Sequence, residues 1–221
     1  MRFIFALALL LFFAGYASSP PLWAQVKQNI SYDYYPVTPQ PGRSLYHQLY
    51  EDTPLRERES GKKITGQATW SLKYERNIKE ISKGKCRLDS YKVFSTCNIS
   101  LPKLMSNDPK LRRDFNAYMT AYLHDHEMTH CKIAADYANR LHAEFKALPT
   151  MDCQEINSAV KETFQRAFAD AQAAQKAFEH EDSIQVKKLS GEKVESGSAL
   201  FGKLLSERRK SPQGRPKSSP A

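Results

Sequence analysis

The stretch NDPKLRRDFNAYMTAYLHDHEMTHCKIAADYANRLHAEFKALP, residues 107–149, decides the fold of this chain. Asn107-Asp108-Pro109 is typical of a helix start, because a capping side chain precedes a proline at the first helical position. Apolar and aromatic residues then recur at intervals of three and four, and no glycine or proline follows until Pro149. The stripe consists of Phe115, Met119, Tyr122, His126, His130, Ile133, Tyr137, Leu141 and Phe145. The stretch therefore predicts one helix of about 38 residues, which must be packed along much of its length.

The flanking sequence predicts a second helix on one side and a small sheet on the other. After a turn at residues 149–152, apolar residues again follow helical spacing over residues 154–178, which predicts a connected helical pair. Residues 65–75 and 88–101 alternate between apolar and polar side chains, as half-buried strands do, and a shorter extended run with prolines lies at residues 32–37. These strands most simply form an antiparallel sheet. The expected fold class is therefore α+β, with a small antiparallel sheet packed on the long helix and on a second, antiparallel helix.

The first 24 residues predict a secretory signal peptide. Residues 1–2 give a positive start, residues 3–13 form an apolar run of suitable length, and small residues fit cleavage after Ala17 or after Ala24. The alternative is an uncleaved membrane anchor, which is disfavoured because the apolar run is shorter than the ~20 residues that a membrane span needs. We therefore expect a periplasmic or secreted protein whose mature folded domain spans residues 25–182.

The net charge of +9 belongs mainly to the C-terminal segment. Residues 183–221 are rich in Lys, Arg, Ser, Gly and Pro and carry nine basic and three acidic residues, whereas residues 25–182 carry a net charge of only +2. This composition predicts a basic disordered tail that contacts anionic envelope surfaces. A nearly neutral folded domain argues against specific binding of nucleic acid, for which clustered basic residues are needed.

The four cysteines are expected to form disulfides, because an even number of cysteines in an exported chain usually pairs. An extended strand separates Cys86 from Cys97 and places them too far apart for a bridge, at ~3.3 Å per residue, unless a hairpin at residues 88–90 folds the segment back. We favour pairing of Cys86 with Cys153 and of Cys97 with Cys131. One bridge with two buried thiols is the alternative.

A candidate metal site lies inside the long helix, in the sequence His126-Glu127-Met128-Thr129-His130. The four-residue step places His126 and His130 on one face, one turn apart, so that both imidazoles can bind one ion. Glu127, next to the first histidine, can act on a metal-bound water. Two imidazoles on an apolar stripe would cost free energy without a partner or a metal, which favours a metal site over a pair of structural histidines. The spacing is that of zincin metallopeptidases, and the expected ion is Zn²⁺.

A catalytic zinc usually has three protein ligands and a water, so the two histidines leave one ligand to be found. Asp136 lies six residues after His130, a position that binds zinc when a glycine breaks the helix. Here Ile133 stands in place of that glycine, so the helix continues and Asp136 points away. An antiparallel second helix would instead return its C-terminal end to the site. The candidates there are His180, which we expect to be the third ligand, and its neighbours Glu179 and Glu181.

Six segments of the chain together carry a resemblance to a known family. They are Tyr34-Tyr35-Pro36-Val37, Gly66 to Trp70, Gly84-Lys85-Cys86-Arg87-Leu88, Ile99-Ser100-Leu101-Pro102, His126-Glu127-x-x-His130 and Asp152-Cys153. Over about residues 30–182 the chain resembles a bacterial domain-of-unknown-function family described as secreted, zinc-dependent proteases. The resemblance implies a zincin-like fold, zinc held by His126 and His130, and Glu127 as catalytic acid and base. It also implies the pairing of Cys86 with Cys153, since the matching cysteines recur in that family without the other two.

The sequence thus predicts a periplasmic or secreted zinc peptidase that hydrolyses peptides or proteins in the cell envelope or outside the cell. Zinc would activate a water molecule, and Glu127 would act as the general base. The alternative is a non-catalytic binding or scaffold protein of the cell envelope with a structural or vestigial metal site. At the end of the second helix, family members tend to show a Tyr-Asp…Thr-x-His-Gly segment, whereas this chain has Phe-Glu-His-Glu-Asp at residues 178–182. The resemblance therefore assigns no third ligand.

Overall fold

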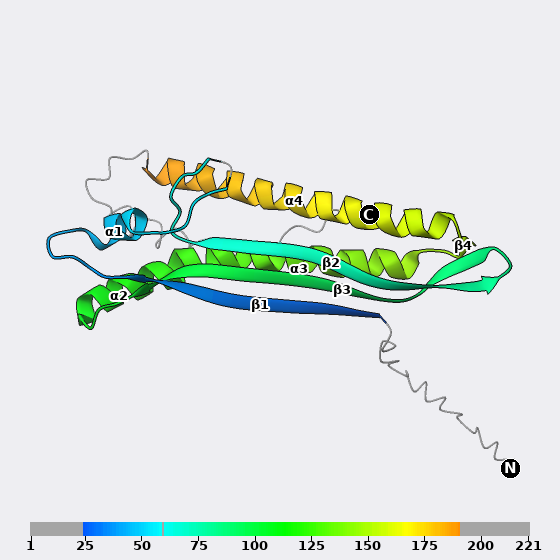
Figure 1. Cartoon of the computed structure of the whole chain (residues 1–221). Coiled ribbons are helices and arrows are strands. Elements are labelled where there is room, and N and C mark those ends of the chain that lie inside the picture. Colours follow the sequence, from blue (N-terminus) through cyan, green and yellow to red (C-terminus); the bar gives the residue numbers. More distant parts are fainter. Residues whose placement is uncertain (1–23, 59, 191–221) are drawn as a thin grey trace, which may run out of the picture.

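A computed structural model describes residues 24–58 and 60–190 of the chain. It shows an α+β fold in which a mixed sheet packs against two long helices (Figure 1), which confirms the expected fold class. The elements in chain order are β1 (Ala24–Val37), α1 (Leu45–Glu51), β2 (Gln67–Ser82), β3 (Lys85–Leu104), α2 (Pro109–Tyr118), the π-helical turn η1 (Met119–Leu123), α3 (His124–Ala147), β4 (Met151–Asp152) and α4 (Glu155–Ser190). The predicted signal peptide, residues 1–24, lies outside the described residues except for its last residue.

The sheet has the strand order β1-β3-β2, with the short β4 added to the beginning of β3. β2 and β3 form an antiparallel hairpin whose turn contains Gly84 at φ 75°, a left-handed conformation that glycine adopts at little cost. β1 runs parallel to β3, with Val26 opposite Val93 and Val37 opposite Leu104. The sheet is therefore mixed rather than purely antiparallel as expected. After β1 the chain crosses to the far side of β3 and forms β2 there. Alternation of apolar and polar residues identifies strands but does not reveal such a crossover.

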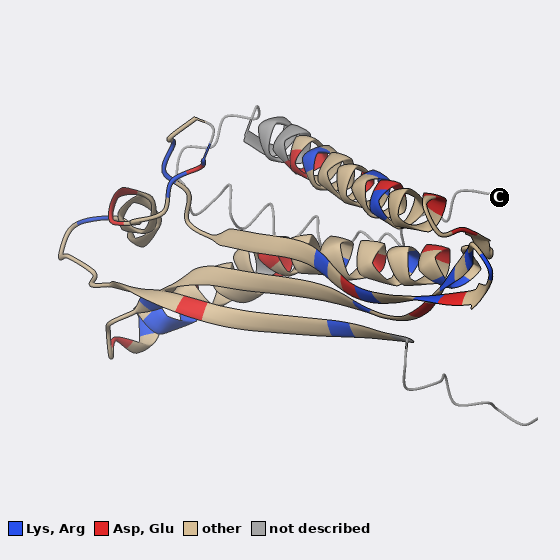
Figure 2. Ribbon diagram, turned by 45° about the vertical axis from the view of Figure 1, so that its right-hand side comes forward, with Lys and Arg blue, Asp and Glu red and all other residues tan. Residues whose placement is uncertain are grey.

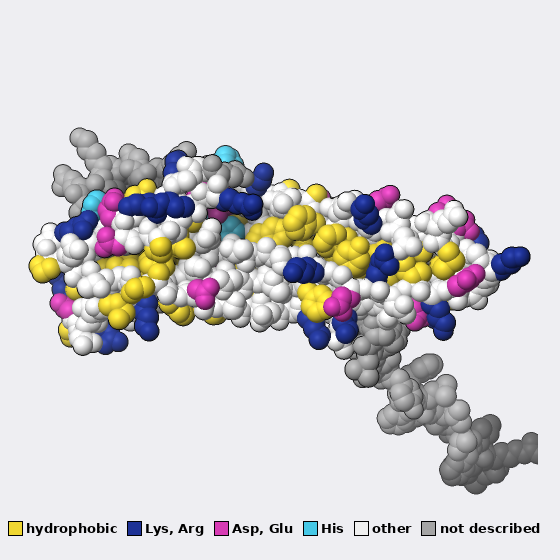
Figure 3. Space-filling view, in the orientation of Figure 1, with side chains coloured by type: hydrophobic (Ala, Val, Ile, Leu, Met, Phe, Trp, Pro, Cys, Tyr) yellow, Lys and Arg dark blue, Asp and Glu magenta, His cyan; other side chains and the backbone are white. Residues whose placement is uncertain are grey.

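The two faces of the sheet differ in polarity. β3 shows the half-burial predicted for residues 88–101, because the residues at every second position from Val93 are buried: Val93, Ser95, Cys97, Ile99 and Leu101. On this side β2 and β3 pack against α3 and α4, with Leu72, Leu141 and Val160 in the same cluster. Few charged side chains lie in the centre of the opposite face (Figure 3), and on this face the hydroxyl oxygens of Ser71 and Thr96 lie 2.7 Å apart.

The long helix predicted within residues 107–149 is formed by α2, η1 and α3 without a break. The Asp108 carboxylate caps it by accepting hydrogen bonds from the backbone N–H of Lys110 at 2.7 Å and of Leu111 at 3.2 Å. Pro109 follows at the first helical position, as expected. The π-helical turn, for which the sequence shows no signal, ends three residues before His126, and such turns are frequent at functional sites.

The second helix, α4, returns along α3 and is longer than expected. It continues to Ser190 instead of ending near Phe178, so residues 183–190 of the predicted tail continue the helix. The rest of that predicted tail, residues 191–221, lies outside the described residues. None of the helices in residues 24–58 and 60–190 combines the length and the apolar character needed to cross a membrane.

Two disulfides join the helical layer to the sheet and confirm the favoured pairing. Cys86 is bonded to Cys153, with their Cα atoms 4.8 Å apart, at the point where β4 pairs with the beginning of β3. Cys97, in the middle of β3, is bonded to Cys131, the residue that follows His130 on α3. Because disulfides persist mainly in oxidising compartments, both bonds are consistent with an extracytoplasmic protein.

Candidate metal centre

The candidate site lies where the N-terminal part of α3 faces the C-terminal part of α4. Nε2 of His130 lies 2.8 Å from Oε1 of Glu179, and Nε2 of His126 lies 3.4 Å from the same oxygen. The three donor atoms all lie within 4.8 Å of one another. Ligand atoms of a tetrahedral zinc with bonds of ~2.0 Å are about 3.3 Å apart. His126, His130 and Glu179 are therefore close enough together to share one metal ion.

Glu179, one of the two alternatives, takes the place in the cluster that was expected for His180. Consecutive residues are rotated by about 100° around a helix axis, so a helix that turns Glu179 towards α3 turns His180 to another side. Within the described part of the chain, the cluster with Glu179 is the one group of three or more possible ligand side chains with this spacing. The antiparallel return of α4 to the site agrees with the sequence reasoning, whereas neither His180 nor Glu181 belongs to the cluster.

Side chains behind the two imidazoles orient them. Nδ1 of His130 forms a hydrogen bond with Oε1 of Gln175, whose amide nitrogen donates to the backbone oxygen of His130 at 2.9 Å. The buried Nδ1 of His126 lies 3.3 Å from Oδ2 of Asp182, an ion-pair contact that is not directed as a hydrogen bond. The Tyr122 hydroxyl donates to the same oxygen at 3.0 Å. With each Nδ1 turned to an oxygen, each Nε2 is available to a metal, as is usual for metal-binding histidines.

The electrostatics of the site favour a positive charge. Burial acts to lower the pKa of His126, but the carboxylates of Asp182 and Glu179 outweigh it and raise the pKa to about 9. Hydrogen bonds to His126 and His130 hold the pKa of Glu179 well below its usual range, so this carboxylate is ionised. An ionised carboxylate and surroundings that stabilise cationic charge both favour a divalent metal, whose binding would displace the proton of His126.

Glu127 lies on the side of α3 that faces the beginning of β2. Its side chain is buried, and burial raises the pKa of its carboxyl group. The backbone of Ala68 forms a hydrogen bond with it. The backbone at Gly66 can lie this close to Glu127 because glycine has no side chain. A Cβ at position 66 would lie 2.7 Å from Oε1 of Glu127 and 2.7 Å from Cδ1 of Leu123. A buried carboxyl group of raised pKa beside a metal site is chemically suited to carry a proton.

Two tyrosines hold the segment that precedes Gly66. The Tyr35 hydroxyl donates to the backbone oxygen of Thr65 at 2.8 Å, and the Tyr118 hydroxyl lies 3.0 Å from Oγ1 of the same threonine. Burial raises the pKa of Tyr35 to about 12 and also raises that of Tyr118, so both hydroxyls stay neutral. These contacts connect β1 and α2 to the segment that packs on Glu127.

Sequence reasoning assigned no role to Gln175, Asp182 or Gly66, although Gly66 begins one of the segments that carry the family resemblance. A signal for the first two was present, because the buried residues of α4 follow helical spacing and turn from apolar to polar near its end. They are Ile156, Val160, Thr163, Ala167, Ala171, Gln175 and Asp182. Polar residues that continue an apolar stripe indicate buried hydrogen-bond partners. No comparable signal marks Gly66, because a side chain at this position is excluded only by the nearby side chains of Glu127 and Leu123 in the folded protein.

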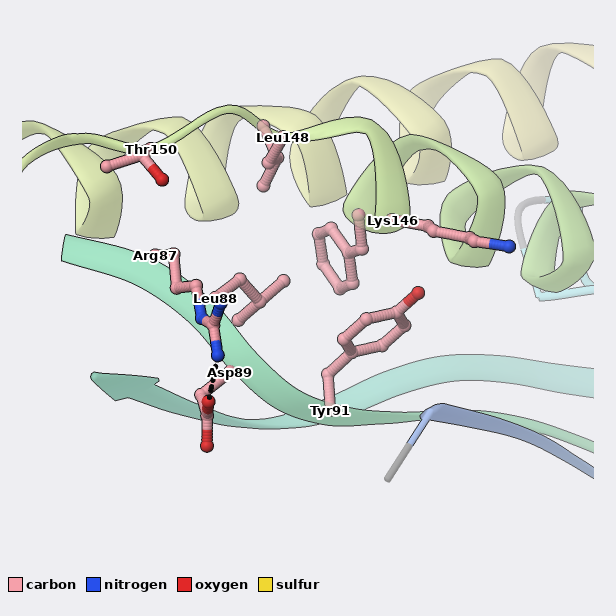
Figure 4. Close-up of a pocket in the computed structure, with 8 residues that line it drawn as sticks. Arg87, Leu88, Asp89, Tyr91, Lys146, Leu148 and Thr150 are labelled. Atoms are coloured by element: carbon pink, nitrogen blue, oxygen red, sulfur yellow. Dashed lines mark hydrogen bonds and ion pairs between the residues drawn. The ribbon is translucent and has the colours of Figure 1, made fainter. Parts of the chain in front are cut away.

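A separate cavity of about 370 Å³ lies near the other end of α3 (Figure 4). Its lining residues are Arg87, Leu88, Asp89, Tyr91, Phe145, Lys146, Leu148 and Thr150. Phe145 follows His130 by fifteen residues, which is about 22 Å along a helix. The Tyr91 hydroxyl donates to the backbone oxygen of His142 at 2.9 Å. None of the candidate metal ligands lines this cavity, which is therefore distinct from the candidate metal centre.

Fold and site together define an α+β protein with a candidate metal centre between two antiparallel helices. The chain belongs to the family described as bacterial protein of unknown function (DUF922), whose family model matches residues 32–185. This match confirms the resemblance to a bacterial domain-of-unknown-function family, and the matched range includes every residue of the site, from Gly66 to Asp182. No curated protein and no solved structure matches the chain.

Proposed function

We propose that this protein is a zinc-dependent peptidase that acts in the periplasm or outside the cell. The observation that carries the proposal is the convergence of His126, His130 and Glu179 beside the buried carboxyl group of Glu127. Two histidines and a glutamate are a known ligand set of catalytic zinc. The HExxH spacing on a helix that packs on a sheet supports a zincin-like assignment. The two disulfides support the location.

Each residue of the site has a defined task in this proposal. Zinc held by the three ligands would act as a Lewis acid on the scissile carbonyl and lower the pKa of a water molecule. The Glu127 carboxylate would accept a proton from the attacking water and pass it to the leaving amine. Its raised pKa supports this task, because a carboxylate of higher pKa is a stronger base. Gln175 and Asp182 would keep the imidazoles in position.

The exposure of the three ligands supports a substrate that approaches from solvent. The side chain of Glu179 is 58% exposed, whereas those of His126 and His130 are 12% and 10% exposed. One side of the cluster is thus open and the other is packed. Peptides or proteins of the cell envelope or the exterior are the substrates that we propose. In the same proposal the basic C-terminal segment contacts anionic envelope surfaces, and the protein binds no specific nucleic acid.

Zinc content and proteolysis of the purified protein test this proposal. We expect about one zinc per chain and hydrolysis of casein or of a peptide library. A chelator should abolish hydrolysis, and added zinc should restore it. Stoichiometric zinc without hydrolysis would instead favour a non-catalytic envelope protein with a structural site. Absence of zinc binding would contradict both the peptidase and a structural zinc site.

Gln175→Ala is expected to lower zinc affinity by about 10- to 100-fold, the usual effect of removing a partner that orients a metal ligand. The substitution removes the oxygen that fixes the His130 ring. Titration of the metal-free protein against a zinc-chelating dye measures the affinity. Gln175→Glu keeps the acceptor oxygen for Nδ1 of His130 but loses the hydrogen bond to the His130 backbone oxygen, so the comparison of the two variants separates the two contacts. An affinity unchanged in Gln175→Ala would show that Gln175 does not orient His130.

A further inference from the structure

β1 is an edge strand whose outer side is open. Among the described residues, no strand pairs with that side, because β1 ends the strand order β1-β3-β2. β1 is 14 residues long. A long edge presents a row of backbone N–H and C=O groups that favours pairing with another chain.

The two edges of the sheet differ in how they are protected. β2 carries five charged residues, namely Lys73, Glu75, Arg76, Lys79 and Glu80, whereas β1 carries only Lys27 and Asp33 (Figure 2). Charged side chains on an edge oppose pairing with other chains. β1 instead exposes large apolar side chains, with Ile30 43%, Tyr32 38% and Tyr34 58% exposed. β1 is therefore the edge that lacks this protection.

The charges of β1 are arranged so that the strand is complementary to itself. Lys27 and Asp33 lie three residues on either side of Ile30. In an antiparallel pair of two β1 strands centred on Ile30, Lys27 of each copy faces Asp33 of the other. The same register places Asn29 opposite Ser31, two polar residues on the same face of the strand. Opposite charges in facing positions stabilise a strand pair.

The same register also covers the exposed apolar side chains. Ile30 faces Ile30 of the second copy, Tyr32 faces Gln28, and Tyr34 faces Val26, all on the face of the sheet that carries the helices. Pairs of aromatic and aliphatic side chains across strands are favourable. Asp33 accepts a hydrogen bond from Asn98 at 2.7 Å, which orients the carboxylate and leaves further acceptor capacity for a lysine.

We propose that two copies of this chain form a dimer through their β1 strands, in an antiparallel register whose two-fold axis passes through Ile30. The sheets of the two copies would join into one sheet of six long strands. Such an interface uses the same surface of both copies, as two-fold symmetric dimers do. The proposal does not depend on the metal chemistry, since no candidate metal ligand lies on β1.

Ile30→Cys tests the register directly. Facing Cα atoms in an antiparallel pair are about 4.5–5.5 Å apart, within the range of a disulfide. Mild oxidation is therefore expected to link the variant into dimers on a non-reducing gel, since the four native cysteines are already paired. In Tyr34→Cys, the matched control, the two thiols would be separated by eight residues, or about 27 Å. Dimers from neither variant, or equally from both, would overturn the proposal.

Exchange of the two charges tests the pairing by a second route. Lys27→Asp or Asp33→Lys places like charges opposite each other at two points and is expected to weaken dimerisation about tenfold. The double variant Lys27→Asp/Asp33→Lys restores both pairs and should regain the wild-type dissociation constant. Sedimentation equilibrium measures the constants, and circular dichroism checks that each variant is folded. A double variant as weak as the single ones, or a wild-type protein that stays monomeric at its highest soluble concentration, would refute the dimer.

Discussion

Replacing Glu127 with glutamine is expected to lower the rate of peptide hydrolysis by about a hundred- to ten-thousand-fold, the range that a general acid–base group contributes. The amide keeps the shape of the side chain but cannot accept a proton from water. Because Glu127 is not one of the three clustered donors, zinc content should stay unchanged. The variant therefore separates proton transfer from metal binding.

The measurement combines hydrolysis of a peptide library with zinc analysis of the same protein preparation. Glu181→Gln is the matched control, because it makes the same chemical change at an exposed position outside the cluster. We expect its activity to equal that of the wild type. An unchanged rate in Glu127→Gln would refute the proposed role of Glu127. Loss of zinc together with activity would show instead that Glu127 supports the structure of the site.

The helical layer could be predicted from sequence because its signals are local. Apolar residues at three- and four-residue spacing and the Asp108-Pro109 start lie within the segment that they describe. β1 was harder to predict in both length and direction. The residues of β1 before Tyr32 lie at the edge of the sheet, where both faces of the strand are largely exposed. Alternation of apolar and polar residues is therefore weak there: on the core side, the polar Gln28 lies between Val26 and Ile30. Its parallel direction depends on a connection across β3 that no local pattern records.

The candidate site shows the same division between local and long-range information. His126, Glu127 and His130 could be found because one helical turn fixes their relation. The third ligand depends instead on how α4 is rotated and shifted against α3. A step of one residue changes the direction of a side chain by about 100°, so Glu179 and His180 could not be separated by proximity in sequence alone. The buried stripe that includes Gln175 and Asp182 indicates which side of α4 faces α3. Glu179 lies four residues after Gln175 and three before Asp182, so the stripe favours Glu179 over His180.

Replacing Glu179 with glutamine is expected to lower zinc affinity by more than about a hundredfold. Loss of a partner behind a ligand already costs about 10- to 100-fold, and here an ionised ligand is itself replaced by a neutral amide. Oε1 of Glu179 lies 2.8 Å from Nε2 of His130 and 3.4 Å from Nε2 of His126, so its charge is central to the cluster. Titration with a zinc-chelating dye measures the change, and peptide hydrolysis should fall with zinc occupancy.

His180→Gln is the matched control for this variant, because it alters the neighbouring residue on the same helix. Its zinc affinity is expected to equal that of the wild type, since His180 does not belong to the donor cluster. The opposite result, loss of zinc in His180→Gln with Glu179→Gln unaffected, would require α4 to present the side of the helix that lies about 100° away. In that orientation Gln175 and Asp182 would also turn from the imidazoles. The Gln175→Ala variant would then bind zinc as the wild type does, so the two experiments check the same rotation of α4 independently.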